Sequence, residues 1–429
     1  MVNQAVILAG GAGVRMKGIT PNAKCLLEIR HKTILEMQIE FFVNSGVDEI
    51  LLLLGYNSDD VSKVAQALAR KYRINVVIEV EDEPLGTGGA LLNALSKLQE
   101  AFYVTHGDLV LQTSLKGFDA SLVSKHFDVA LLYHPTNHPE DSDLLVIRNH
   151  EEVIQIVTKP HSNFMGRCLG NAGLYAFKKN ALIGFNHNSS SQPRKIDLDR
   201  ELLPALLEKG LKVGAIRNLG FVKDLGTPER FKFVEENWDS LTLKSGLRPA
   251  IFLDRDGTLN ELRGFITDPS EIFLAPDGAK FVSEVKNLGF WVIIITNQPV
   301  IARGEVSIAG LDEIHGKLER ELLKEGTIVD DFFFCPHHPD SGFEGEISEL
   351  KVPCKCRKPE VGLIERALEI YPVDLEKSWM IGDSWRDIEL AKSAGIKSIF
   401  LGKKESDAQN ATHSAKSLTE ALTIVRNQI

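Results

Sequence analysis

Two aspartates close together follow a short apolar segment in the second half of the chain. The segment 250–253 reads Ala-Ile-Phe-Leu, and Asp254 and Asp256 come directly after it. Side chains at positions i and i+2 of an extended chain point to the same side, so these two carboxylates form an acid pair. One can attack phosphorus while the other, kept partly protonated by its neighbour's charge, protonates the leaving oxygen and then activates water. Such a pair also suits Mg²⁺.

A second group of reactive side chains lies further along the chain, where Cys335 and His337 are followed by Cys354 and Cys356. Three thiolates and one imidazole complete a tetrahedral Zn²⁺ site, and the stretch between the two pairs is long enough to fold back on itself. Four protein ligands leave no position for water, so this zinc would be structural. The spacing alone does not choose between His337 and His338, and a set of three buried, reduced thiols is the alternative.

Near the N-terminus, a glycine-rich turn comes after the first apolar segment. It contains Gly10, Gly11 and Gly13 and is followed by Arg15 and Lys24. Glycine lets backbone N–H groups approach phosphate oxygens, and the two cations can neutralise a triphosphate. A glycine turn between a strand and a helix is often only structural, and neither the Walker loop nor the full dinucleotide fingerprint is present. The turn alone therefore does not establish a phosphate site.

Short apolar runs alternate with longer amphipathic stretches through most of the sequence. This alternation predicts an α/β protein with mostly parallel, helix-covered sheets. The pattern restarts at residue 250 after a polar stretch containing Pro and Gly, which predicts two domains, 1–237 and 249–429, joined by a linker at 238–248. The runs that set the pattern in the first half are residues 5–8, 33–44, 49–54, 59–71 and 76–80.

The composition limits the classes of partner. The chain has 429 residues and a formal charge of -10, which argues against a broad cationic surface for nucleic acid or anionic lipid. Five cysteines are few and odd in number, so a reducing cytoplasm fits better than a secreted disulfide framework. The N-terminal residues and the lengths of the apolar runs lead us to expect neither a signal peptide nor a membrane span. We therefore expect a cytoplasmic protein whose partners are small molecules; the sequence leaves a homo-oligomer open.

The first half resembles the sugar-nucleotidyltransferase family, whose members join a sugar 1-phosphate to a nucleoside triphosphate. Six pieces occur in the family's order, which implies a Rossmann-like nucleotidyltransferase fold for this half. The pieces are the glycine loop with Lys24, Pro84 to Gly89, Thr105 to Asp108, Lys159-Pro160, Asn171 to Gly173, and Asp224 to Pro228.

The resemblance implies a role for each piece in an in-line displacement at the α-phosphorus, where catalysis is mostly positioning and charge neutralisation. Arg15 would face the departing phosphates and Lys24 the α-phosphate. Mg²⁺ would be held by Asp108 and Asp224. The remaining substrate contacts implied are Gly10, Gly11 and Gly13 at the phosphates, Gly86, Thr87 and Gly88 at the base, Lys159 at the sugar phosphate, and Asn171.

Residues 249–402 resemble the haloacid-dehalogenase (HAD)-like phosphatases, which implies a second Rossmann-like fold with a zinc-binding loop. Asp254 matches the nucleophile that becomes an aspartyl-phosphate, and Asp256 matches the acid/base. Mg²⁺ would be bound by Asp254, Asp256 and Asp383, the last in an acidic loop that continues to Asp387. The phosphate contacts implied are Thr296, Asn297 and Lys358.

The Cys/His stretch narrows this resemblance to a zinc-bearing subgroup that contains heptose 1,7-bisphosphate 7-phosphatases and histidinol phosphatases. The spacing in those enzymes favours His337 as the ligand. The match is better to the heptose enzymes, although Ser384 stands where a basic residue is common. Arg303 and Arg357 are candidates to bind the phosphate that is not cleaved, with ordinary surface arginines as the alternative.

The two reactions would run in series. Loss of the 7-phosphate from D-glycero-D-manno-heptose 1,7-bisphosphate leaves heptose 1-phosphate, which the first half would couple to a nucleotide for surface glycans. The first half resembles heptose-1-phosphate guanylyltransferases, which implies GTP as the nucleotide and GDP-heptose and pyrophosphate as the products. ATP is the alternative nucleotide. A second hypothesis pairs a hexose-1-phosphate nucleotidyltransferase with a histidinol-phosphate-type phosphatase. A third treats one half as a catalytically dead module, against which the intact motifs of both halves argue.

Overall fold

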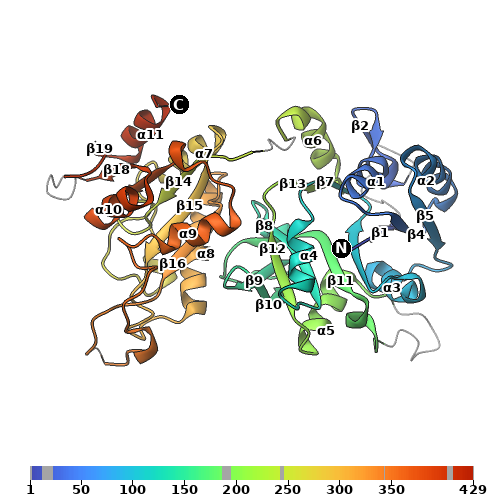
Figure 1. Cartoon of the computed structure of the whole chain (residues 1–429), viewed down its shortest axis with the longest axis horizontal. Helices are drawn as coiled ribbons and strands as arrows, with labels where there is room; N and C mark the ends of the chain where they lie inside the picture. The colour runs from blue at the N-terminus through green and yellow to red at the C-terminus, as the bar shows by residue number, and fades with distance from the viewer. Residues whose placement is uncertain are drawn as a thin grey trace. The chain divides into compact units, whose positions relative to one another are not determined.

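The computed structural model describes residues 2–11, 23–185, 195–241, 246–342, 344–402 and 409–428. The chain forms two compact units, the first comprising Met1–His134, Glu140–His161 and Leu169–Lys244, and the second Pro135–Pro139, Ser162–Cys168 and Ser245–Ile429 (Figure 1). Helix α6 (Pro228–Leu241) continues into the stretch expected as linker. The two-domain α/β organisation agrees with the expectation, whereas the limits at 237 and 249 stay a prediction.

The first unit is built on a mixed sheet. Among the described residues it has nine strands in the order β5-β4-β1-β6-β11-β8-β12-β10-β9. The strands β5, β4, β1 and β6 run parallel, and β11 is antiparallel to β6. The strands are β1 (Gln4–Ala9), β4 (Glu49–Leu54), β5 (Asn75–Val80), β6 (Ala101–His106), β8 (Val129–Pro135), β9 (Leu144–Arg148), β10 (Glu152–Val157), β11 (Leu169–Lys178) and β12 (Val213–Arg217).

Strand β1 explains why the parallel strands read as continuous apolar runs. Its alternate residues Ala5 and Ile7 belong to one buried cluster, and Val6 and Leu8 belong to another. A strand covered on both faces has no solvent side and therefore loses the polar alternation of an exposed sheet. The helices of this unit besides α6 are α1 (Ile34–Asn44), α2 (Ser58–Tyr72), α3 (Gly86–Asn93), α4 (Lys116–Val123) and α5 (Leu203–Glu208).

Two small sheets complete the first unit. The strands β2 (Glu28–Ile29) and β3 (Lys32–Thr33) form a hairpin, and β7 (Leu109–Gln112) pairs antiparallel with β13 (Phe221–Asp224). In the β7–β13 pair, Asp224 lies opposite Leu109, and the N–H of Leu225 donates to the carbonyl of Asp108 at 2.9 Å. Two aspartates more than one hundred positions apart are thereby brought to the same place.

The second unit is built on a parallel sheet, whose six strands in the described residues lie in the order β16-β15-β14-β17-β18-β19. The central strand β14 is buried along its whole length. Each neighbouring pair runs parallel, so the carboxyl ends of β14, β15 and β17 meet at one edge. The strands are β14 (Ala250–Leu253), β15 (Trp291–Asn297), β16 (Asp331–Cys335), β17 (Trp379–Gly382), β18 (Lys397–Leu401) and β19 (His413–Ala415).

Helices cover this parallel sheet and bury its apolar side chains (Figure 1). Within the described ranges, no helix combines the length and apolar character that crossing a bilayer requires. The helices of the second unit are α7 (Gly278–Asn287), α8 (Ile308–Lys324), α9 (Gly362–Ile370), α10 (Trp385–Ala394) and α11 (Leu418–Arg426).

The second unit also includes a short segment from the first half of the sequence, Ser162–Cys168. Inside this unit the guanidinium of Arg167 is buried and pairs with Glu319 at 3.1 Å and with Asp331 at 2.9 Å. Buried charges persist only when they are paired and hydrogen-bonded. The segment therefore satisfies two carboxylates that the rest of the second unit leaves buried.

Candidate active sites

A cavity of about 570 Å³ opens in the first unit at the carboxyl ends of parallel strands. This is where ligands bind in open α/β sheets, and the volume falls in the range of small-molecule sites. The lining residues that matter for the argument are Gly10, Gly11, Lys24, Glu81, Gly86, Thr87, His106 and Asp108.

The aspartates expected to bind Mg²⁺ here each have a cation beside them. The Nζ atom of Lys24 lies 3.0 Å from Oδ2 of Asp108, and Arg230 pairs with Asp224. Burial opposes the ionisation of Asp224, but the Arg230 charge outweighs it and lowers the pKa of this carboxyl. Asp108 precedes β7 and Asp224 ends the paired strand β13, and two such carboxylates fit Mg²⁺, which is bound through one or two carboxylates together with substrate phosphates.

The glycines expected around the nucleotide differ in their surroundings in the structure. Gly10, Gly11 and Gly86 line the cavity, as does Thr87. The amide of Gly88 instead donates to the carbonyl of Ile196 at 2.8 Å, and a Cβ on Gly88 would come within 3.0 Å of the Ile196 side chain. Gly88 thus serves the packing of helix α3 on the 196–198 segment.

Gly13 and Arg15, which the sequence places at the triphosphate, lie outside the described residues.

Lys159, expected at the sugar phosphate, and Asn171, expected to contact substrate, are joined through Asp143. The N–H of Lys159 donates to Oδ1 of Asp143 at 3.0 Å, and the N–H of Asn171 donates to its carbonyl at 3.1 Å. The Nζ atom of Lys159 contacts the carbonyl of Asp141. The structure thereby brings Lys159 and Asn171 together, although neither lines the cavity.

A polar network links Asn171 to the cavity. Asp199 accepts hydrogen bonds from Asn171 at 2.9 Å and from Tyr175, and it lies 3.1 Å from Nε2 of His106. Although burial opposes it, the Asp199 carboxylate raises the pKa of His106 to about 9, so the imidazole carries a positive charge beside the cavity.

Gly173 makes room for this network. A Cβ at Gly173 would come within 3.1 Å of the His106 ring. The sequence singled out the Asn171–Gly173 segment but gave no sign of Asp199 or Tyr175, because no motif joins them to it.

The second unit has a smaller pocket, of about 130 Å³, at the edge where β14, β15 and β17 end. It is lined by Asp254, Asp256, Thr296, Asn297, Lys358, Ser384, Arg386 and Asp387. The Nζ atom of Lys358 lies 2.7 Å from Asp254 and 2.6 Å from Asp387, and only 4% of this lysine side chain is exposed. Six of the phosphatase residues expected from the sequence therefore share one pocket.

The two carboxylates of the acid pair differ in their surroundings. Burial raises the pKa of Asp254 despite the charge of Lys358. Asp256 is held by Arg255, whose Nε and Nη2 donate to its two oxygens at 3.0 and 2.8 Å, and also by Gln298 at 2.9 Å. These donors outweigh burial and lower the pKa of Asp256. The contacts with Arg255, which lies between the two aspartates, therefore favour the charged form of Asp256, and its role as the proton donor stays a prediction.

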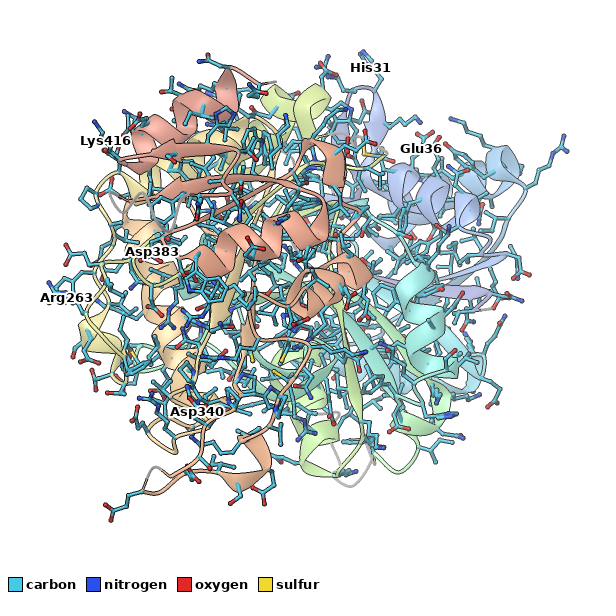
Figure 2. The ribbon with its side chains drawn as sticks, turned by 60° about the vertical axis from the view of Figure 1, so that its left-hand side comes forward. His31, Glu36, Arg263, Asp340, Asp383 and Lys416 are labelled. Carbon is cyan, nitrogen blue, oxygen red and sulfur yellow. The ribbon has the colours of Figure 1, made fainter. Side chains whose placement is uncertain are left out.

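Asn297 and Gly257 fix the geometry around the pair. The Asn297 side chain accepts from the N–H of Lys358 at 3.0 Å and donates to its carbonyl at 3.2 Å, so it clamps the lysine backbone. A Cβ at Gly257 would come within 2.1 Å of the carboxylate of Asp383 (labelled in Figure 2), so only glycine lets that carboxylate approach. Burial raises the pKa of Asp383 to about 6, and the nearby Asp254 adds to the effect.

Oxygen atoms of Asp254, Asp383 and Asp387 lie within 4.8 Å of one another. This all-carboxylate donor set fits Mg²⁺. Asp256, which the sequence also assigns to the metal, is not in that group because its oxygens face Arg255 and Gln298.

The arginines around this pocket differ from the expectation. Arg303 stacks on Phe265 at 4.1 Å, and Arg357 donates to the carbonyl of His337 at 3.1 Å; neither lines the pocket. Arg386 does line it and was missed, because no motif marks that position. Ser384 accepts from the N–H of Arg386 at 3.2 Å and caps helix α10.

The Cys/His cluster has the shape of a zinc site. The sulfurs of Cys335, Cys354 and Cys356 lie 3.3–3.5 Å apart, and Nδ1 of His337 is 3.2 Å from Cys356. Sulfurs around a tetrahedral Zn²⁺ lie about 3.8 Å apart for Zn–S bonds of about 2.3 Å. His338 faces the backbone of Asp340 (labelled in Figure 2) instead. The structure therefore groups His337, and not His338, with the three thiols.

Comparisons with known proteins identify a related family for each of the two units. Residues 4–239 match the model of the family described as nucleotidyl transferase, and residues 355–423 match the family described as HAD-hydrolase-like. A D-glycero-beta-D-manno-heptose-1,7-bisphosphate 7-phosphatase of Rhodopseudomonas palustris is 38% identical over 156 residues, which are 36% of this chain and 84% of that protein. The corresponding alpha-anomer phosphatase of Photorhabdus laumondii is 34% identical over 38% of this chain and 87% of that protein.

A solved structure of HddC from Yersinia pseudotuberculosis is also similar, with 25% identity and a TM-score of 0.46 over 55% of this chain and all of that one.

Proposed function

Because the chain belongs to the nucleotidyl transferase family through residues 4–239 and to the HAD-like heptose-1,7-bisphosphate 7-phosphatases through its C-terminal part, we propose that it activates a heptose in two consecutive reactions. It is a bifunctional enzyme with one nucleotidyltransferase and one phosphatase. The observation that carries the proposal is the fusion itself: removing the 7-phosphate yields a sugar 1-phosphate, which is what a sugar nucleotidyltransferase consumes. These soluble, phosphorylated intermediates suit a cytoplasmic enzyme that supplies surface glycans.

In the phosphatase, the carboxylate of Asp254 attacks the 7-phosphorus and forms an aspartyl-phosphate, and the sugar oxygen leaves with a proton. Lys358, 2.7 Å from Asp254, neutralises the phosphoryl group. Asp256 is the carboxylate assigned to proton transfer and to activation of the water that cleaves the intermediate. Mg²⁺ held by Asp254 and Asp383 would add charge neutralisation when bound.

In the transferase, an oxygen of the sugar 1-phosphate attacks the α-phosphorus of the nucleotide while pyrophosphate leaves. Lys24 lies in the cavity beside Asp108 and supplies positive charge at the reacting phosphates. Mg²⁺ held by Asp108 and Asp224 would do the same for the triphosphate. Arg15 remains our candidate for the departing phosphates.

The test offers both anomers of heptose 1,7-bisphosphate with each nucleoside triphosphate in turn and records phosphate, pyrophosphate and the nucleotide-sugar. We expect phosphate release without any nucleotide, and pyrophosphate only when GTP is added. If neither anomer loses phosphate, the pathway assignment is wrong. If phosphate is released but ATP replaces GTP, the alternative nucleotide is correct.

Glu81 supports GTP as the nucleotide. Its carboxylate lines the cavity, and the N–H of Leu85 donates to Oε2 at 3.3 Å. An ionised carboxylate only accepts hydrogen bonds. Guanine presents donors at both N1 and N2, whereas adenine presents an unprotonated N1, so a carboxylate at the base favours guanine.

We expect Glu81→Gln to lower the preference for GTP over ATP, measured as the ratio of kcat/KM values, by about tenfold or more. The neighbouring Glu83→Gln variant is the matched control because Glu83 does not line the cavity. An unchanged ratio in Glu81→Gln would exclude this carboxylate from base selection.

We propose that the Cys/His cluster holds a structural Zn²⁺, and adjacent histidines allow a direct test. His337→Gln removes a ligand and should lose the metal and lower the Tm, whereas His338→Gln should keep about one zinc per chain. The measurements are metal analysis of the purified chain and thermal unfolding. About one zinc in both variants would exclude His337 as a ligand, and absence of zinc from the unmodified chain would mean that the cluster is only a group of reduced thiols.

A further inference from the structure

We propose that helix α8 of the second unit positions the sugar 1-phosphate for the transferase, because α8 holds the segment Ser162–Cys168, which Lys159 and Asn171 flank in the sequence. Those two residues are our candidates for contacts with the acceptor substrate. The inference rests on the proposed transferase activity and extends it, because it makes a helix of the phosphatase a positioning element for the other reaction.

One face of α8 is adapted to this segment. Its residues Asp312, Gly316 and Arg320 follow one another at intervals of four and therefore lie on the same side of the helix. The N–H of Arg167 donates to Oδ2 of Asp312 at 3.2 Å. The guanidinium of Arg320 donates to three successive carbonyls of the segment, those of residues 164–166, at 2.8 and 2.9 Å. The backbone of the segment is thus bound at several points.

Gly316 allows the segment to lie directly on the helix. A Cβ at this position would overlap the carbonyl oxygens of Met165 and Gly166. Glycine is unfavourable in the interior of a helix, and Gly316 lies in the middle of α8. Its presence there is explained by the close approach of the segment, which a side chain would push away.

Glu319 fixes the end of the segment that leads into strand β11. Its Oε2 accepts from the N–H of Cys168 at 2.6 Å, and its Oε1 accepts from the guanidinium of Arg167 at 3.1 and 3.2 Å. Both side chains of this ion pair are buried, and breaking such a pair leaves an uncompensated charge. Because β11 begins at the residue after Cys168, α8 fixes the start of the strand that carries Asn171.

The contacts of Lys159 and Asn171 connect the segment to the transferase cavity. Both backbone amides donate to Asp143, at 3.0 and 3.1 Å, so the chain before the segment and the chain after it meet at one residue. The Asn171 side chain donates to Asp199, which contacts His106 at the cavity. A displaced segment would therefore shift both acceptor contacts, whereas the nucleotide contacts expected from the glycine loop and α3 come from other parts of the chain.

The test uses Arg320→Met and Gly316→Ala in the full chain. The first removes the donors to the three carbonyls, the second forces the segment off the helix, and neither breaks the buried ion pairs of Arg167. We expect KM for heptose 1-phosphate to rise by about tenfold or more, while KM for GTP and the phosphatase kcat/KM stay unchanged. Lys324→Met, on the same helix, is the matched control because Lys324 pairs with Glu321 instead.

Amide hydrogen exchange of residues 162–168 measures whether the segment stays in place. Exchange at Cys168 should be faster in Arg320→Met and in Gly316→Ala than in the unmodified chain, because Glu319 protects its N–H only while the segment is bound. Faster exchange with an unchanged KM for heptose 1-phosphate would show that the segment does not position the sugar. Unchanged exchange would show that these α8 residues do not hold it.

Two further outcomes would overturn the inference. If KM rises equally for heptose 1-phosphate and GTP, or if the phosphatase activity falls in the same variants, the contacts of α8 serve the fold of the chain and not sugar binding. Absence of pyrophosphate release from heptose 1-phosphate and any nucleoside triphosphate by the unmodified enzyme is a different result, because it would reject the proposed function itself.

Discussion

Phosphate release should fall by about four orders of magnitude or more when Asp254 is replaced by asparagine, while pyrophosphate release from heptose 1-phosphate and GTP stays unchanged. An amide cannot form the aspartyl-phosphate, so the phosphatase loses its nucleophile. The transferase cavity is lined by residues of the first unit, so its chemistry does not depend on Asp254. The two activities are measured on one preparation, each serving as the control for the other.

The fold of the Asp254→Asn variant should survive. Burial raises the pKa of Asp254, which means that its charged form is costly in the free enzyme. A neutral amide of the same size removes that cost, and Lys358 keeps Asp387 as a partner. Thermal unfolding checks this directly. Simultaneous loss of both activities with an unchanged Tm would contradict independent sites.

A substitution at Asp108 should have the opposite effect: the transferase activity is lost and the phosphatase activity is kept. Replacing it by asparagine should lower pyrophosphate release by at least about a hundredfold and leave phosphate release from the bisphosphate intact. The variant removes the carboxylate that pairs with Lys24 at 3.0 Å and, in our proposal, a ligand of Mg²⁺. The positive charge of Lys24 then has no fixed partner at the reacting phosphates.

A variant with both Asp108→Asn and Asp224→Asn tests whether the two carboxylates bind the same ion. If Asp108 and Asp224 hold one ion, either single change to asparagine already removes the site, so the double variant should be no less active than the worse single one. Multiplicative losses would instead mean that the two carboxylates act separately. Titration of Mg²⁺ against activity, with each variant, distinguishes loss of metal affinity from loss of the chemical step.

Much of the phosphatase pocket could be predicted from the sequence because its residues lie at strand ends. Asp254, Thr296 and Asp383 each come directly after or at the end of an apolar run, and parallel neighbours must bring such ends together. The zinc cluster could also be predicted, because one Cys-x-His pair and one Cys-x-Cys pair at short spacing are typical of zinc sites. In both cases the spacing in the chain already limits the geometry.

Other parts of the sites depend on contacts that spacing does not encode. Asp199 contacts His106 although the two are 93 positions apart in the sequence. Arg386 lies in the first turn of α10, and no feature of that turn's sequence distinguishes it from an ordinary amphipathic helix. No motif marks Arg255, which lies between the two aspartates of the acid pair. Its contact with Asp256 depends on a side-chain conformation, which no residue pattern determines.

If the cluster holds zinc as we propose, the position of Lys358 two residues after Cys356 makes the phosphatase activity depend on the supply of zinc. The lysine that neutralises the phosphoryl group continues the backbone of the thiol cluster, and Asn297 clamps its peptide from the other side. A cell short of zinc would then hold a chain that still couples sugar 1-phosphates but no longer makes them, so the bisphosphate would accumulate upstream.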